Sequence, residues 1–69
     1  MEWLKVGNQI IVTRPFQAKE AFNSRTIRAG SRGRIVGLSG FAQFGKVEVL
    51  TEDGFAIIHI DYLTVPNRN

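Results

Sequence analysis

The strongest constraint on the fold lies in the stretch from Lys46 to Ile60. Val47 and Val49 alternate with charged residues, which is the period-two pattern of a strand with one buried face. An isoleucine-rich run follows directly after Asp53-Gly54. Asp-Gly favours a tight turn, because glycine has no Cβ and readily adopts a positive φ. The stretch therefore predicts a β-hairpin.

Three shorter segments complete a set of five predicted strands. Gly7-Asn8 precedes a β-branched run that ends at Arg14-Pro15, where proline removes a ladder hydrogen bond. One 3₁₀ turn over 61–63 is expected before the last strand. The segment from Pro15 to Gly30 is predicted to be a long first loop, with either one turn of helix or two extended arms. The five predicted strands are 9–13, 34–38, 46–50, 55–60 and 64–66.

Length and cysteine content limit the classes of protein that this chain can belong to. A chain of 69 residues predicts one domain over 1–69, with a frayed polar tail at 66–69. The absence of cysteine excludes a disulfide framework and a thiolate zinc site. The first five residues lack the pattern of a signal peptide, and no apolar run approaches the roughly 20 residues of a membrane span. We expect a soluble cytoplasmic protein that does not associate with membranes.

The sequence offers little material for catalysis. His59 is the only histidine, so it cannot form a metal site with a second imidazole. The serines lack a Gly-x-Ser-x-Gly context. Glu52 and Asp53 are expected at a hairpin tip in water, where nothing raises the pKa of a carboxylate for acid catalysis. The chain is therefore predicted not to be an enzyme and to need no cofactor or metal ion.

Basic residues are concentrated in and around the predicted first loop. The whole chain has a net charge of +3, but between Arg14 and Arg34 six basic residues accompany Glu20 alone. Phe16 and Phe22 lie among these cations. Guanidinium groups bind phosphates and flat rings stack on unpaired bases, so this composition suits single-stranded nucleic acid. The predicted binding residues are Arg14, Phe16, Lys19, Phe22, Arg25, Arg28, Arg32 and Arg34.

Two other interpretations of this segment remain open. The same arginines would fit an acidic protein surface, and an ordinary solvated surface can also be basic. Phe16 and Phe22 can equally serve to anchor the loop to the rest of the domain.

The second strand of the hairpin presents apolar side chains on both faces. If Val47 and Val49 point inward, Phe55, Ile57 and His59 lie on the outer face. Either strongly bent strands of a small barrel or the long first loop, folding back, bury these side chains, or they form a contact between subunits of a homo-oligomer.

The order of these elements resembles the SH3-like small β-barrel over nearly the whole chain. Gly7 followed by Ile10 and Val12, and then the run from Gly33 to Val36, resembles the glycine-then-strand rhythm of KOW-type barrels in ribosomal and transcription-elongation proteins. The resemblance implies an all-β, five-stranded barrel. The Ala-Leu-Tyr-Asp-Tyr-like run and the groove tryptophan of peptide-binding SH3 domains are missing, which argues against recognition of proline-rich peptides.

A second resemblance concerns two stretches, from Gly33 to Gly37 and from Gly54 to His59. They resemble stretches of the plasmid-borne type II dihydrofolate reductases, which are homotetrameric SH3-like barrels with a central active-site pore. That family carries Val-Gln-Ile-Tyr in the strand after the hairpin turn, and here only Ile58 matches, because Ile57 and His59 replace the amide and the phenol. The run from Val12 to Pro15 also has a faint resemblance to small barrel subunits of electron-transfer complexes.

These observations lead to three functional hypotheses. The first is a non-catalytic module whose basic first loop binds nucleic acid, RNA rather than DNA. The second is a small accessory or regulatory subunit that docks on an acidic protein surface in a larger complex. The third and most remote is a homo-oligomeric enzyme similar to the type II dihydrofolate reductases.

Overall fold

The computed structural model describes residues 4–19, 24–38 and 45–66. These residues form an all-β fold with one 3₁₀ turn and no α-helix. A five-stranded antiparallel sheet has the order β6-β5-β4-β1-β7, and β2 and β3 form a separate two-stranded hairpin. The elements are β1 (Gln9–Val12), β2 (Phe16–Lys19), β3 (Ser24–Ile27), β4 (Arg32–Gly37), β5 (Lys46–Thr51), β6 (Gly54–His59), η2 (Ile60–Tyr62) and β7 (Leu63–Thr64).

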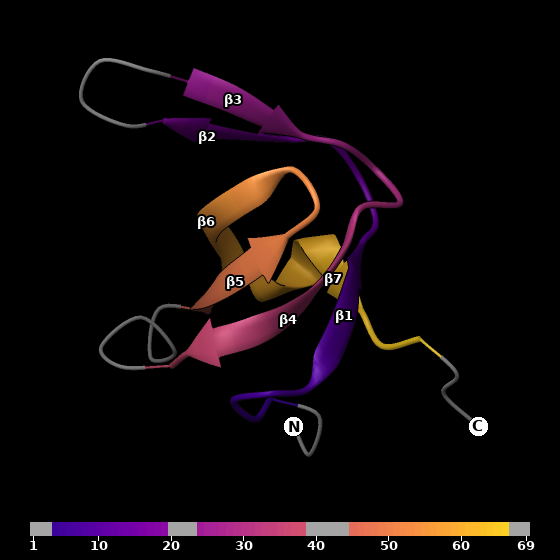
Figure 1. Cartoon of the computed structure of the whole chain (residues 1–69), viewed down its shortest axis with the longest axis vertical. Helices are drawn as coiled ribbons and strands as arrows, with labels where there is room; N and C mark the ends of the chain where they lie inside the picture. The colour runs from indigo at the N-terminus through magenta and orange to yellow at the C-terminus, as the bar shows by residue number, and fades with distance from the viewer. Residues whose placement is uncertain (1–3, 20–23, 39–44, 67–69) are drawn as a thin grey trace.

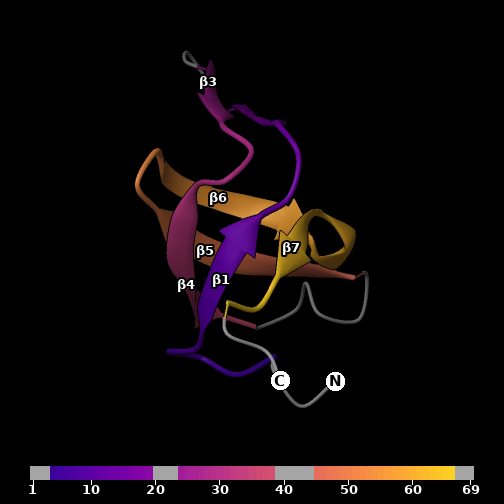
Figure 2. The same ribbon diagram turned by 90° about the vertical axis from the view of Figure 1, so that its right-hand side faces the viewer.

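The five-stranded sheet curls into a half-barrel. In Figures 1 and 2, β5 and β6 cross over β1 and β4 instead of lying flat beside them. The register between β4 and β5 shifts between Ile35 and Gly37, which marks a β-bulge in β4. Bulges bend the strand that carries them and increase its twist, so this one assists the curling.

The core follows the predicted alternation along the strands. Val47 and Val49 in β5 are fully buried, as are Ile35 in β4 and Ile58 in β6. These β-branched side chains suit the pleated surface of a sheet, because their restricted rotamers pack well against cross-strand neighbours. The remaining buried apolar residues are Ile10, Val12, Ala18, Ile27, Ala56 and Leu63.

The β5–β6 hairpin agrees with the sequence-based prediction. Thr51 pairs with Gly54 across a two-residue turn, and Gly54 has a φ of 115°. A positive φ of this kind strains any residue with a Cβ, which explains the glycine after Asp53. Thr51 Oγ1 accepts a hydrogen bond from the backbone N of Asp53 and donates one to the carbonyl O of Gly54, so the turn is held from inside.

The predicted long first loop is instead the β2–β3 hairpin, so the interpretation as two extended arms is correct as far as the described residues go. Phe16 pairs with Ile27 and Lys19 with Ser24. The hairpin folds back, because its inner side chains Ala18 and Ile27 are buried in the core. The alternative of a helical turn is wrong for Ala18 and Lys19, which lie in β2.

Small shifts separate the remaining predicted elements from the observed ones. The 3₁₀ turn covers Ile60–Tyr62, one residue earlier than expected, and the closing strand covers Leu63–Thr64 instead of 64–66. Leu63 is buried, and Thr13 N donates to the carbonyl O of Tyr62 at 2.6 Å. These contacts explain why the last strand begins at Leu63, one residue earlier than predicted. The all-β class is confirmed, and the SH3-like topology stays a resemblance.

Candidate functional site

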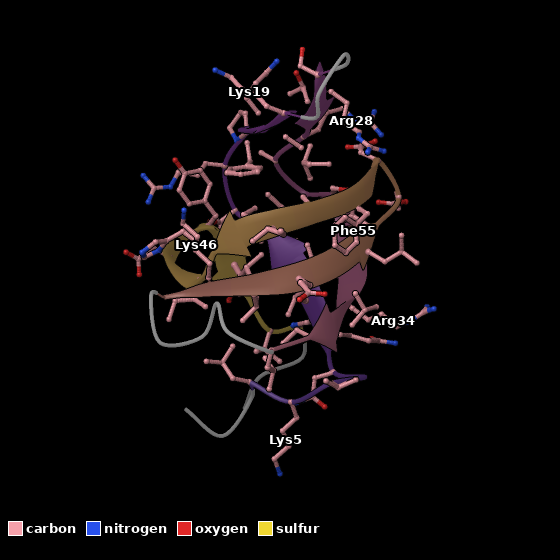
Figure 3. All side chains as sticks on the ribbon, turned by 90° about the vertical axis from the view of Figure 1, so that its left-hand side faces the viewer. Lys5, Lys19, Arg28, Arg34, Lys46 and Phe55 are labelled. Atoms are coloured by element: carbon pink, nitrogen blue, oxygen red, sulfur yellow. The ribbon has the colours of Figure 1, made fainter. Side chains whose placement is uncertain are left out.

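The cations of the first-loop segment do not form one continuous surface. In Figure 3, Arg28, Phe55 and Arg34 lie along one side of the view, and Lys19 and Lys46 along the other. Phe22 lies outside the described residues. Each of the other predicted binding residues therefore has to be judged by its own contacts.

Arg28 is occupied by a carboxylate of the chain itself. Its Nη2 lies 2.8 Å from Asp53 Oδ1 and its Nε 3.0 Å from Asp53 Oδ2. The backbone N of Arg28 donates to the same Oδ2 at 2.9 Å. The hydrogen bond from the Arg28 side chain lowers the pKa of Asp53 from 3.8 to about 2, and the pairing raises the pKa of Arg28. This bidentate pair fastens the end of β3 to the β5–β6 turn, and a polyanion would have to displace it.

Arg25 belongs to the same junction. Gly54 has no side chain, and the Arg25 guanidinium occupies the space where a Cβ would stand. Arg25 is half-buried and pairs with Ala18 across the hairpin. The two arginines of the β3 region therefore pack against the β5–β6 turn, and their position explains how the hairpin is held.

Arg14 and Phe16 form an aromatic cluster with Tyr62. The Arg14 guanidinium carbon lies 4.3 Å from the centre of the Tyr62 ring, and the Phe16 ring meets Tyr62 edge-on at 5.5 Å between centroids. Phe16 is half-buried against the core. These contacts give Phe16 the anchoring role, and Arg14 already covers one face of the tyrosine ring.

Unlike Arg28, which pairs with Asp53, and Arg14, which packs on Tyr62, the guanidinium groups of Arg32 and Arg34 have neither an ion pair nor an aromatic ring as a partner within the described residues. Both are exposed, and they project from the same face of β4. They line a shallow pocket of about 340 Å³ together with Gln9 and Pro66. The backbone of Arg32 is fixed, since its N donates to Glu52 Oε1 and its O accepts from the N of Glu52. These two arginines of the predicted set can receive an anion without giving up an ion pair or a contact with an aromatic ring within the described residues.

The outward side chains of β4, β5 and β6 form a surface that we call the outer face. Its residues are Arg34, Val36, Lys46, Glu48, Leu50, Phe55, Ile57 and His59. The register aligns Arg34 with Leu50 and Leu50 with Phe55, so one row crosses all three strands. Glu48 aligns with Ile57 in the next row.

Apolar side chains dominate the middle of the outer face. Leu50 and Phe55 are each 41% exposed, Ile57 37% and Val36 36%. Val6 is the one other large apolar side chain among the described residues that is comparably exposed. The folded-back hairpin therefore does not bury Phe55 and Ile57, which was one of the two interpretations of these residues. This concentration of partly exposed apolar side chains makes the outer face a candidate interaction surface.

His59, the third residue of the predicted subunit contact, has a local structural role. Its Nδ1 accepts a hydrogen bond from the backbone N of Asp61 at 3.2 Å, which caps the 3₁₀ turn. The described residues contain no group of three histidine, cysteine or acidic side chains placed to hold a metal ion.

Three structural features were not predicted from the sequence: the exposure of Val36, the exposure of Leu50 and the ion pair of Arg28. Leu50 has the same parity as Lys46 and Glu48, so the alternation that predicted the strand also placed Leu50 outward. Val36 is exposed next to the bulge, and the alternation along β4 places it on the same face as Arg34, opposite the buried Ile35. The carboxylate of Asp53 is 25 residues away from Arg28, and only the folded register brings them together.

The chain matches no protein-family model, no curated protein sequence and no solved structure. No helix among the described residues is long and apolar enough to cross a membrane.

Proposed function

We propose that this chain is a non-catalytic binding module that docks through its outer face on an acidic surface of a partner protein. The observation that supports this most is the position of the exposed apolar side chains. Val36, Leu50, Phe55 and Ile57 gather on this face, and Arg34, which has no ion pair among the described residues, lies in the same row as two of them.

The composition of the outer face fits a protein partner better than a polyanion. Protein interfaces combine an apolar centre with arginine, which binds carboxylates through two parallel hydrogen bonds. Nucleic-acid surfaces depend mainly on many phosphate contacts. Here Arg28 is held by Asp53 and Arg14 packs on Tyr62, so fewer cations remain for phosphates.

RNA remains a second candidate because of one specific feature. Phe55 is an exposed aromatic ring on a sheet surface, and it shares a cross-strand row with Arg34. A ring that stacks on a base beside a guanidinium that binds phosphate is the usual arrangement for single-stranded RNA.

A capture experiment with and without nuclease separates these candidates. Tagged protein is incubated with native lysate, and three forms are compared: the wild type, Leu50→Glu and Val6→Glu. Val6 is the matched control, because it is an exposed apolar residue outside β4, β5 and β6, the strands that form the outer face. We expect nuclease-resistant capture of a protein by the wild type and Val6→Glu, and loss of that protein with Leu50→Glu.

Three outcomes would contradict the proposal. Capture that disappears with nuclease would favour RNA. Equal capture by Leu50→Glu and the wild type would remove the outer face from the interaction. A wild type that captures nothing and forms dimers in light scattering would turn the outer face into a contact between copies of this chain.

A further inference from the structure

A groove runs between β2 and β6, beside the outer face. It has a volume of about 570 Å³ and is lined by Phe16, Gln17, Ala18, Lys19, Phe55, Ala56 and Ile57. The volume is within the range of pockets that hold small ligands or a few side chains. Two strand edges form its walls, because β2 pairs with β3 and β6 pairs with β5, and no backbone hydrogen bond joins β2 to β6.

The width of the groove decides what can enter it. A strand that is hydrogen-bonded to both walls would keep β2 and β6 about 10 Å apart, twice the spacing of neighbouring strands. Cα atoms of β2 and β6 approach each other within 8 Å. The groove is therefore too narrow for an added strand, but side chains can insert from a segment that lies across its opening.

The walls of the groove determine which side chains fit. Ala18 and Ala56 are buried and leave a hollow between the two strands, while Phe16, Phe55 and Ile57 provide apolar surface around it. An aromatic or branched aliphatic side chain in this hollow would gain burial without having to displace a polar group.

The charge at the groove determines what must flank that side chain. Lys19 is exposed and has no ion pair among the described residues, and no lining residue carries a carboxylate. Lys19 directly follows Ala18, and a strand rises about 3.4 Å per residue. A carboxylate within two or three residues of the inserted side chain would therefore reach Lys19.

A second copy of this chain is a poorer occupant. Neither β2 nor β6 contains an acidic residue, so the corresponding edges of another molecule would leave Lys19 without a partner. We propose that the β2–β6 groove binds an extended acidic segment of a partner protein, with one apolar side chain inserted between β2 and β6 and one carboxylate at Lys19. This inference rests on the proposed function, because Phe55 and Ile57 belong to both surfaces.

The test uses synthetic nine-residue Gly/Ser peptides and the full-length protein. The central residue is Phe, Leu or Ala, and a single Glu or Lys stands two or three residues away. Binding is followed by NMR shifts of backbone amides in β2 and β6. We expect the Phe/Glu or Leu/Glu peptides to bind at least tenfold more tightly than the Ala/Glu and Phe/Lys peptides.

Three variants of the protein sharpen the test. Lys19→Glu should reverse the charge preference, so that the Lys peptides bind better than the Glu peptides. Lys5→Glu is the matched control, because Lys5 is exposed and lies at the opposite end of the molecule from Lys19 (Figure 3). Ala18→Leu should fill the hollow and weaken the Phe/Glu peptide at least tenfold.

Several results would overturn the inference. The first is that no peptide shifts the amide signals of β2 and β6 at millimolar concentration. The second is that Lys19→Glu keeps the wild type's preference for Glu peptides. The third is that the protein self-associates as its concentration rises and that Lys19→Glu abolishes this association. Ala18 is buried, so Ala18→Leu can fold poorly. The charge preference of Lys19→Glu, a variant at an exposed position, is therefore sufficient to decide the test.

The failures of the two proposals can be told apart. A wild type that captures its partner but shows no shifts with any peptide overturns the groove alone. Peptide binding as expected, together with equal capture by Arg34→Glu and the wild type, overturns the outer face alone, because Arg34 does not line the groove.

Discussion

The five-stranded sheet and the β2–β3 hairpin are held in different ways. In the sheet, fully buried side chains such as Val47, Val49 and Ile58 pack across several strands. The hairpin contributes Ala18 and Ile27 to the same core, but its link to the β5–β6 turn is an ion pair in which the Arg28 side chain is exposed. Buried apolar contacts stabilise a fold far more than exposed ion pairs do. The sheet is therefore stabilised mainly by burial, and the hairpin by two buried side chains together with one ion pair.

The largest expected effect comes from two adjacent isoleucines of β6 that face opposite ways. Ile58→Ala empties a fully buried position and should cost about 2–5 kcal/mol of unfolding free energy. Ile57→Ala removes the same atoms from the exposed outer face and should cost less than about 1 kcal/mol. Urea denaturation measures both. Equal losses would mean that Ile57 is also part of the monomer's core.

A smaller effect is expected from two glycines of β4. A Cβ on Gly33 would collide with the backbone O of Leu50, whereas a Cβ on Gly37 would meet the side chain of Glu48, which can move. Gly33→Ala should therefore cost about 1–3 kcal/mol, the usual range for overpacking, and Gly37→Ala less than about 0.5 kcal/mol. Thermal unfolding of the two variants provides the comparison. If Gly37→Ala costs more stability than Gly33→Ala, the close approach of Gly33 to the backbone of Leu50 is not the tightest contact between β4 and β5.

The smallest effect concerns the ion pair that holds the hairpin. The pKa of Asp53 is about 2 in the folded chain and 3.8 without its partners, so its contribution is complete above about pH 4. That contribution is lost as the pH falls from about 4 through 2. NMR relaxation of β2 and β3 should therefore show a rigid hairpin from pH 7 to 5 and increased motion below pH 4.

Asp53→Asn provides the control for this titration. It should show the looser hairpin already at pH 7, while the amides of β5 and β6 keep their protection. A hairpin that is equally rigid in Asp53→Asn and the wild type would mean that Ala18 and Ile27 alone hold it in place.

The difference between the two regions also explains which features could be predicted from sequence. The β5–β6 hairpin was predicted because the alternation of Val47 and Val49 and the Asp53-Gly54 turn are local signals. The β2–β3 hairpin was predicted only as a loop with two alternatives, since Phe16–Lys19 has no β-branched residue and owes its strand to pairing with β3. Tertiary contacts decided its conformation.

The candidate site could be predicted only in part for a similar reason. The alternation of side chains along β6 correctly predicted that Phe55 and Ile57 lie on the outer face. The prediction that the arginines act together does not take account of Arg28, which Asp53 holds, or Arg14, which packs on Tyr62. Asp53 and Tyr62 are distant from these arginines in sequence. The composition of the segment therefore indicated how many cations it contains but not which of them are unpaired.

Side-chain labelling with a photoreactive diazirine tests most directly whether the outer face is a docking surface. Tagged protein is labelled in buffer and in nuclease-treated native lysate, and modification is quantified residue by residue. If the outer face docks on a partner, labelling of Leu50, Phe55 and Ile57 falls in the lysate while labelling of Val6 is unchanged. Unchanged labelling of all four residues, or an equal fall at Val6, would contradict docking through this face.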